Sequence, residues 1–416
     1  MKRLLPTTLL VAAVVAASSL AHASFQVGQV FIGTCNGTID VYDPTSGALV
    51  QTLNTTLPGQ NQTYVCTYGI TFDGSGNVYA VTFDQHNGFV VKFDNNGNQL
   101  GTFGSGYNLP NSILHDQSGN FYVGQIIGPI LKFDPTGIPL DSYTPARDPN
   151  SQNNPGVEIA LKADQHTLLY SSWGCEIKSY NVATKIQGPD YVYNCPAGKG
   201  PTQVAALRVL PDASLIVLTD TRGYGVDGLM AARWGPPCSG CYPYQLVSPK
   251  IYNPGSYYPV EFKLGLDPDG VNFWTIDIES GYLYKFNIRA GSFSNPLYTG
   301  AGNFDPVAIY GDGMNSTASF TPSLTFPDQK VGTKSAPLRA SIKNTGQIEM
   351  VVSTFKISGD FRIGNNYCRS GIKPGTHCDI DVVFAPRRTG LRLGTLSVSD
   401  NATDSPQAIA LSGRGY

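Results

Sequence analysis

The sequence predicts an all-β protein, in which a six-bladed β-propeller closed by its last strand is followed by a C-terminal β-sandwich. Three observations lead to this fold class. A four-strand pattern recurs at intervals of roughly 40–50 residues, which is typical of propeller blades. Near residue 316 it gives way to about seven short strands with regular turns, as in a sandwich domain. The net charge also changes sign between the two parts.

The chain begins with the three-part pattern of a cleavable secretory signal. Lys2 and Arg3 precede an apolar run over residues 4–17, and Ala21 and Ala23 are the small residues of a signal-peptidase site. A membrane anchor is the alternative, but the run is shorter than the roughly 20 residues that span a bilayer. No later segment is long and apolar enough to cross a membrane. We therefore expect residues 1–23 to be removed and the rest to be secreted, periplasmic or at the cell surface.

Charge separates the exported chain into two parts. Residues 24–316 carry a net charge of −9, whereas residues 317–416 have 12 basic and seven acidic residues and a net charge of +5. This asymmetry supports two domains with these boundaries. It argues against nucleic acid as a partner, because duplex-binding domains show a concentrated basic face. We expect an extracellular or periplasmic protein or a glycan instead.

Eight cysteines remain after signal removal. In an exported chain an even number indicates disulfides, although sequence alone does not fix their connectivity. Nearness along the chain suggests three pairs and leaves a fourth: Cys175–Cys195, Cys238–Cys241, Cys368–Cys378 and Cys35–Cys66. Cys238 and Cys241 have the spacing of a redox pair or half a zinc site. A structural loop staple is favoured, because no second such pair and no nearby histidine follow.

The repeat predicts the blades in order. Each unit has short strands in which apolar and polar residues alternate, separated by Gly-Asn, Asn-Gly or Asp-Gly turns. Copies begin at residues 69, 112, 159, 207 and 264. The first unit, residues 29–53, lacks an innermost strand, whereas residues 306–310 have the sequence of an innermost strand with no blade after it. Together they complete a sixth blade, which closes the ring without an open sheet edge at the join.

Two resemblances follow from these motifs. The Asp-x-x-Gly-Asn-[Val/Phe]-Tyr turns and Lys-Phe-Asp strands resemble the NHL-repeat propellers and the related gluconolactonase-like superfamily over about residues 25–315. Residues 317–416, with Asn-Thr-Gly, Pro-Gly, Phe-Ala-Pro and Leu-Ser-Gly in order, resemble the choice-of-anchor D or ASH-type immunoglobulin-like domain. That family is generally non-catalytic, so the resemblance implies attachment, spacing or protein contact. The alternative is a domain that only stabilises or extends the propeller.

Aligned copies place one residue of each innermost strand at a common level: Tyr68, Asn111, Glu158, Ala206, Phe262 and Val307. The gluconolactonase-like resemblance implies a divalent ion such as calcium at this channel mouth, held by carboxylate and amide oxygens. It nominates Glu158 and Asn111, with Glu261 and Asp305 as further candidates. This ligand set is incomplete, so we expect no required cofactor. In the alternative, Glu158 is solvated or paired with a base such as Lys263.

Two further sets of residues suggest ligand contact. One position of the second strand is polar in all six copies: Thr34, Thr82, Gln125, Ser172, Thr219 and Asp277. Such a ring would hydrogen-bond a polar ligand, but hydroxyls and amides also satisfy backbone groups at strand ends, which is the favoured interpretation. The insertion over residues 234–258 carries Tyr242 and Tyr244, whose rings suit stacking on sugars or peptides. Tyrosine-rich surface loops also occur without binding anything.

The functional prediction rests partly on absent motifs. The chain has no G-x-S-x-G elbow, no HExxH and no phosphate-binding loop, which disfavours a serine hydrolase, zinc peptidase or nucleotide enzyme. We predict a secreted, non-catalytic binding or scaffold protein that uses the channel mouth. The alternative is a metal-dependent lactonase or hydrolase with Glu158 and Asn111 as ligands. A propeller lyase is a third option, but no histidine stands out at the channel mouth as its base, because the sequence does not fix which way His115 faces.

Overall fold

The structure is a computed structural model, and it is all-β as predicted. It describes residues 24–416 except for residues 150–155, 191–203, 211–214, 221–228, 235–244, 247–262, 301–305 and 313–316 and gaps of one to three residues elsewhere. The expected signal segment, residues 1–23, lies outside the described residues. Among the described residues, no helix is long and apolar enough to cross a membrane.

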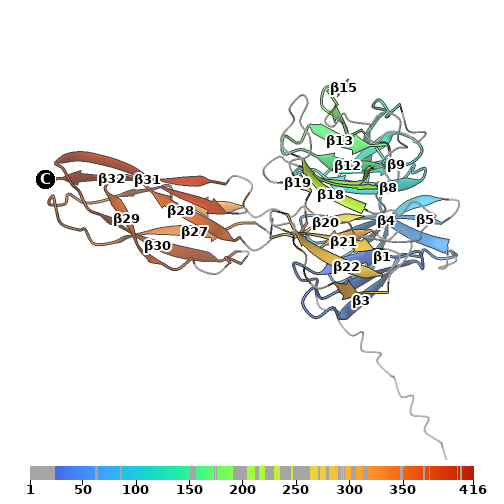
Figure 1. Cartoon of the computed structure of the whole chain (residues 1–416), viewed down its shortest axis with the longest axis horizontal. Helices are drawn as coiled ribbons and strands as arrows, with labels where there is room; N and C mark the ends of the chain where they lie inside the picture. The colour runs from blue at the N-terminus through green and yellow to red at the C-terminus, as the bar shows by residue number, and fades with distance from the viewer. Residues whose placement is uncertain are drawn as a thin grey trace, which may run out of the picture.

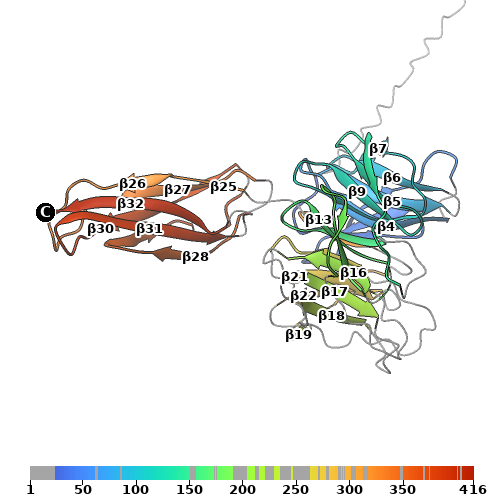
Figure 2. The ribbon, with the colours of Figure 1, turned by 90° about the horizontal axis from the view of Figure 1, so that it is seen from above.

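Six four-stranded antiparallel sheets cover residues 30–309 of the described chain. Figures 1 and 2 show them arranged around a common centre as the blades of a propeller. The first sheet has β1 (Val30–Gly33), β2 (Thr38–Tyr42), β3 (Leu49–Asn54) and β24 (Val307–Ile309). The second has β4 (Val65–Phe72), β5 (Val78–Asp84), β6 (Gly88–Phe93) and β7 (Gln99–Thr102), and the third has β8 (Pro110–His115), β9 (Phe121–Gln125), β10 (Ile130–Phe133) and β11 (Pro139–Tyr143).

The other three sheets have the same order of strands from the centre outward. The fourth has β12 (Glu158–Leu161), β13 (Thr167–Ser171), β14 (Lys178–Asn181) and β15 (Ile186–Gln187). The fifth has β16 (Val204–Val209), β17 (Leu215–Asp220), β18 (Leu229–Trp234) and β19 (Gln245–Leu246). The sixth has β20 (Leu264–Leu266), β21 (Asn272–Asp277), β22 (Tyr282–Asn287) and β23 (Leu297–Tyr298).

The last strand of the repeat region joins the first sheet. β24 pairs antiparallel with β1, with Ile309 opposite Val30 and Val307 opposite Ile32. This is the pairing that the sequence predicts from the incomplete first unit. The backbone groups along the inner edge of β1 therefore have hydrogen-bond partners, which removes an open edge.

The repeated Asp-Gly-Asn turns are built by aspartate side chains. Asp73 Oδ1 accepts the backbone N–H groups of Ser75 and Asn77, both at 2.9 Å, and its Oδ2 accepts the Tyr79 hydroxyl at 3.0 Å. Gly76 within this turn has φ 79°, a conformation that favours glycine. Asp94, Asp116 and Asp134 make equivalent turns. The recurring motif therefore sets where each hairpin turns.

Aromatic side chains pack the sheets against one another. Phe31 of the first sheet lies 5.0 Å from Phe72 of the second, measured between ring centroids, and Tyr310 contacts both. Tyr79 and Phe121 of the second and third sheets are 4.3 Å apart. These rings are almost completely buried, so the hydrophobic effect holds neighbouring blades together.

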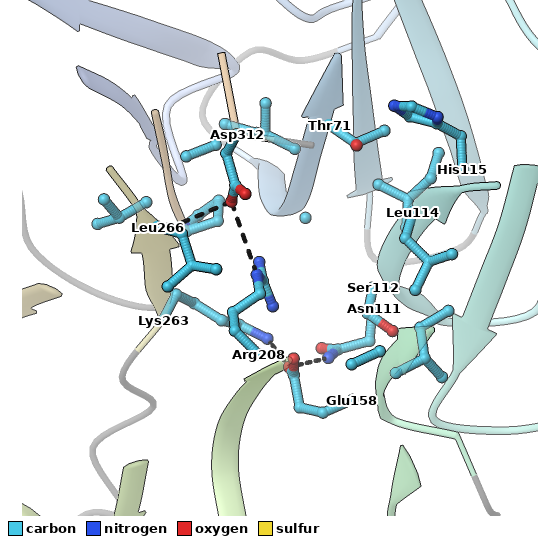
Figure 3. Close-up of a pocket in the computed structure, with 18 of the residues that line it drawn as sticks. Thr71, Asn111, Ser112, Leu114, His115, Glu158, Arg208, Lys263, Leu266 and Asp312 are labelled. Carbon is cyan, nitrogen blue, oxygen red and sulfur yellow. Dashed lines mark hydrogen bonds and ion pairs between the residues drawn. The ribbon is translucent and has the colours of Figure 1, made fainter. Parts of the chain in front are cut away.

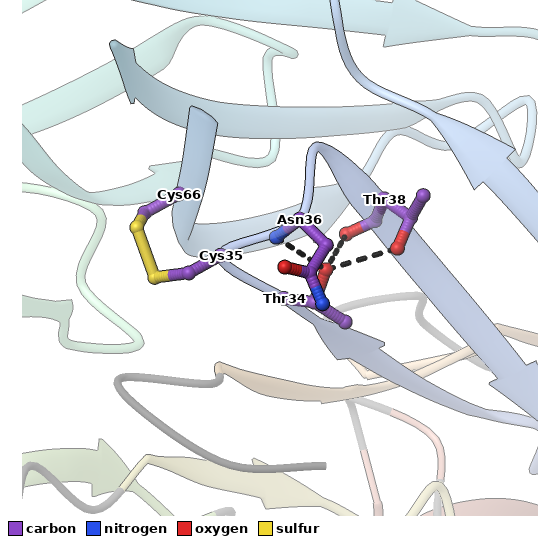
Figure 4. Close-up of a disulfide and its surroundings, with 5 residues drawn as sticks. All are labelled: Thr34, Cys35, Asn36, Thr38 and Cys66. Atoms are coloured by element: carbon purple, nitrogen blue, oxygen red, sulfur yellow. Dashed lines mark hydrogen bonds between the residues drawn. A yellow bond between two sulfur atoms is a disulfide. The ribbon is translucent and has the colours of Figure 1, made fainter. Parts of the chain in front are cut away.

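A disulfide joins the first two blades next to the ring closure. Cys35, in the turn after β1, is bonded to Cys66 in β4 (Figure 4). The second disulfide of the described residues, Cys368–Cys378, lies in the C-terminal region. Both pairs match the predicted connectivity. The predicted Cys175–Cys195 and Cys238–Cys241 pairs lie outside the described residues.

The C-terminal residues form an immunoglobulin-like β-sandwich, which Figure 1 shows apart from the propeller. One sheet has the order β25 (Ala318–Phe320), β27 (Leu338–Asn344), β30 (His377–Phe384) and β29 (Phe361–Asn366). The other has β26 (Ser323–Thr325), β32 (Gln407–Gly415), β31 (Gly390–Asp400) and β28 (Val352–Ile357), with β26 parallel to β32. Buried residues from both sheets, among them Ile342, Phe384 and Leu411, form one core cluster.

Candidate functional site

A cavity of about 180 Å³ lies where the innermost strands of the six blades converge (Figure 3). Its lining combines aliphatic side chains with three basic or imidazole groups and two carboxyl groups. The ionisable residues are His115, Glu158, Arg208, Lys263 and Asp312. These five residues come from five different segments of the chain, which meet where the innermost strands converge.

Irregular strand pairing occurs in three of the innermost strands that line the cavity. The register between innermost and second strands shifts at the same place in three blades, around Tyr68 in β4, Asn111 in β8 and Ala205 in β16. A bulge redirects side chains and is common beside functional sites. The sequence alignment put Ala206 at this level. Ala206 is paired with Leu218, just as Glu158 of the same predicted level is paired with Ser171.

Asn111, Glu158 and Lys263 form a buried cluster at one end of the cavity. The Asn111 amide Nδ2 donates to Glu158 Oε1 at 3.0 Å and to the Val157 carbonyl at 2.9 Å. The Lys263 ammonium pairs with the same Glu158 oxygen. Only 3% of the Glu158 side chain and 7% of the Lys263 side chain are exposed. The charges of this pair therefore cancel within the protein.

This arrangement does not fit the calcium site that the resemblance implies. Calcium takes about six to eight oxygen ligands. Here Glu158 Oε1 already accepts an ammonium and an amide N–H, and Asn111 turns its NH₂ group toward the carboxylate. No group of three His, Cys, Asp or Glu side chains suited to a metal occurs among the described residues. The alternative, in which Glu158 pairs with Lys263, matches the geometry.

Arg208 and Asp312 also line the cavity, and Figure 3 shows the Arg208 side chain reaching from beside Lys263 and Glu158 toward Asp312. Arg208 Nε is 3.8 Å from Asp312 Oδ2, and the backbone N–H of Leu266 donates to that oxygen at 3.2 Å. Sequence reasoning missed this pair. The available signals were that Arg208 occurs in an innermost-strand copy and that Asp312 follows the closing strand by three residues.

Burial raises the pKa of Asp312 above its usual value of 3.8, although Arg208 and the Leu266 N–H act in the opposite direction. The Asp312 carboxyl therefore holds its proton more tightly in the folded protein than in the unfolded chain. Above the raised pKa, ionisation of the buried Asp312 carboxyl lowers the free energy of unfolding. This loss disappears as the pH falls toward 3.8, the usual pKa of the group.

We expect Asp312→Asn to raise the melting temperature at pH 7, with a difference that shrinks as the pH approaches 4. Thermal melts followed by circular dichroism between pH 4 and pH 8 measure it. Asp134→Asn is the matched control, because the Thr136 hydroxyl and the Ile138 N–H hold the pKa of Asp134 below its usual value. That substitution should lower the melting temperature. An unchanged or lower value for Asp312→Asn at pH 7 would contradict this account.

Three side chains of the predicted polar ring form hydrogen bonds with groups close to the ends of strands. The Thr34 hydroxyl bonds to that of Thr38 at 2.9 Å, that of Thr82 donates to the Phe89 carbonyl at 3.2 Å, and Gln125 Nε2 donates to the Pro129 carbonyl at 2.7 Å. These side chains and that of Ser172 are buried, and none of the four lines the cavity. The strand-end interpretation is therefore favoured over a ligand ring.

Several predicted residues are not placed by the structure. Thr219 and Asp277 lie in β17 and β21, but their side chains are outside the described part. Five other predicted residues lie wholly outside the described residues: Tyr242, Tyr244, Glu261, Phe262 and Asp305.

The fold and the site together define a β-propeller protein whose cavity contains the buried Glu158–Lys263 ion pair. No protein-family model matches the sequence. No curated protein matches it either. Among solved structures, a chain from the crystal structure of a nidogen/laminin complex is similar, with a TM-score of 0.47 and 12% identity, over 68% of this chain and 98% of that one. What this protein binds must be inferred from its own residues.

Proposed function

We propose that this chain is a secreted, non-catalytic binding or scaffold protein that holds a polar ligand, a glycan or a protein partner at its propeller channel. Residues 1–23 are removed on export. Residues 24–316 form an NHL-repeat or gluconolactonase-like propeller, and residues 317–416 form a choice-of-anchor D module that mediates association. The partner is an extracellular or periplasmic protein or glycan, and no cofactor is required.

The proposal rests on a neutralised Glu158–Lys263 ion pair and on a neighbouring polar atom, Asn111 Oδ1, that has no hydrogen-bond partner among the described residues. Glu158 is held by Lys263 and Asn111 and is therefore poorly placed to bind a metal or to accept a proton from a substrate. Asn111 Oδ1 is buried and has no hydrogen-bond partner among the described residues. Leaving such an acceptor unpaired costs about 1–3 kcal/mol. A ligand hydroxyl or amide in the adjoining cavity would remove that cost.

Disulfide formation supports the export part of the proposal. Cys35 is bonded to Cys66 and Cys368 to Cys378, and no described cysteine is free. Disulfides form and persist in oxidising compartments and are rare in the cytosol. This agrees with the signal pattern of residues 1–23.

The test uses the chain from residue 24 onward with glucose, N-acetylglucosamine and glycerol as neutral polar probes. We expect at least one probe to raise the melting temperature, and Asn111→Leu to abolish that shift. Gln99→Leu, on the outer strand β7, is the control and should retain it. Hydrolysis of gluconolactone is followed in a pH-stat with calcium and with a chelator. We expect no rate above the uncatalysed one.

Two results would overturn the proposal. The first is that no neutral probe shifts the melting temperature in a way that depends on Asn111. The second is calcium-dependent lactone hydrolysis that is lost in Glu158→Gln, which would assign the protein to the metal-dependent lactonases instead.

A further inference from the structure

The Arg208 guanidinium enters the cavity with most of its donors unused by the described residues. It has five N–H donors, and its Nη1 donates to the Leu207 carbonyl at 3.0 Å. The 3.8 Å separation from Asp312 is an ion-pair distance but is too long for a hydrogen bond. Arg208 also keeps 28% of its side chain exposed. It can therefore accept an anionic partner without breaking a tight internal pair.

The other charges of the cavity leave Arg208 open to an anion. Lys263 and Glu158 neutralise each other. Asp312 competes for Arg208 only weakly, because its Oδ2 lies closer to the Leu266 N–H and burial raises its pKa. A planar carboxylate is a good partner for a guanidinium, because two parallel N–H···O bonds match both groups.

The cavity that Arg208 enters also has aliphatic lining. Leu114, Leu161, Val209 and Leu266 line the same cavity. Its volume of about 180 Å³ is close to that of cavities of about 150 Å³ that hold a benzene-sized molecule. A ligand that fills it therefore has only a few carbons beyond its polar head.

From these features we infer that Arg208 forms a subsite for a small monocarboxylic acid, with the carboxylate on the guanidinium and a short hydrocarbon tail against the leucines. This inference rests on the proposed function, because it names the ligand class of the same channel. It concerns binding alone, and no bond is made or broken.

The test compares butyrate with butyramide, which has nearly the same shape and no charge, by isothermal titration calorimetry on the chain from residue 24 onward. We expect butyrate to bind at least about tenfold more tightly than butyramide, because a charge-assisted bidentate contact is lost in the amide. Arg208→Met should remove this preference. Arg208→Lys should retain part of it, and Asp312→Asn should strengthen butyrate binding by removing the competing carboxyl. Arg339→Met, an exposed site in the sandwich, is the control.

Equal affinities for butyrate and butyramide would overturn the inference. An unchanged preference for butyrate in Arg208→Met would also overturn it, provided that the variant melts at the wild-type temperature. If Arg208→Met does not fold, a reduced preference in Arg208→Lys and a larger preference in Asp312→Asn support the inference in its place, and an unchanged preference in both variants overturns it. Different results would overturn the proposed function and the proposed subsite at Arg208. Binding of neutral probes that depends on Asn111, without butyrate binding, overturns the subsite alone. Butyrate binding together with calcium-dependent lactone hydrolysis overturns the non-catalytic function alone.

Discussion

Replacing Lys263 by methionine will destabilise the propeller by about 3–5 kcal/mol, because the Glu158 carboxylate is left buried without its counter-ion. The double variant Glu158→Gln/Lys263→Met removes both charges and should recover most of this loss. Urea unfolding followed by tryptophan fluorescence measures both. All three tryptophans, Trp173, Trp234 and Trp274, precede residue 317, so this signal reports on the propeller region.

The double variant separates a buried ion pair from simple loss of packing. If Lys263 only fills space, the double variant will be at least as unstable as Lys263→Met. A loss below about 1 kcal/mol in Lys263→Met would also contradict the account, since exposed pairs have values in that range.

Replacing Cys35 and Cys66 by alanine will lower the stability of the propeller by about 2–4 kcal/mol. The bond spans 31 residues and ties the first blade to the innermost strand of the second, next to the join of the ring. Its loss widens the unfolded ensemble and releases the first hairpin from β4. Urea unfolding followed by tryptophan fluorescence is again the measurement.

The Cys368–Cys378 bond supplies a matched control for the first disulfide. Replacing both cysteines by alanine removes a disulfide from the sandwich, where the chain has no tryptophan. We expect the fluorescence transition to stay where it is in the wild type. A shift as large as that caused by losing Cys35–Cys66 would show that the two regions do not unfold independently.

The blades could be predicted from the sequence because their signals are local. Each Asp-Gly-Asn turn contains the carboxylate, the glycine and the backbone donors that build it, as at Asp73 and Gly76. Alternation then places buried residues such as Tyr79 on the core side. Ring closure by β24 was predictable because the first unit visibly lacks a strand that the last segment supplies.

The channel could be predicted only in part. Glu158 and Asn111 were found because the copies align, and the structure brings their side chains together. Their partner Lys263 is 105 residues from Glu158, and such a contact across the ring leaves no regular spacing in the sequence. The bulges at Tyr68 and Asn111 also interrupt the two-residue period, so alternation cannot say which inner residues face the cavity.

The expected calcium site illustrates that resemblance to a family does not by itself establish a metal site. A propeller mouth can supply carboxylate and amide oxygens, but here one carboxylate oxygen accepts an ammonium and an amide N–H. The sequence offered Lys263 as an alternative partner of Glu158, and the positions of the atoms favour this pairing over the calcium site.

We propose that the channel binds a polar ligand without a metal ion. The most direct test of this proposal is the calcium content of the purified chain from residue 24 onward, together with its melting temperature in calcium and in a chelator. We predict a calcium-free protein whose melting temperature is the same in both. One calcium per chain and a melting temperature lowered by the chelator, with both effects absent in Glu158→Gln, would contradict the claim.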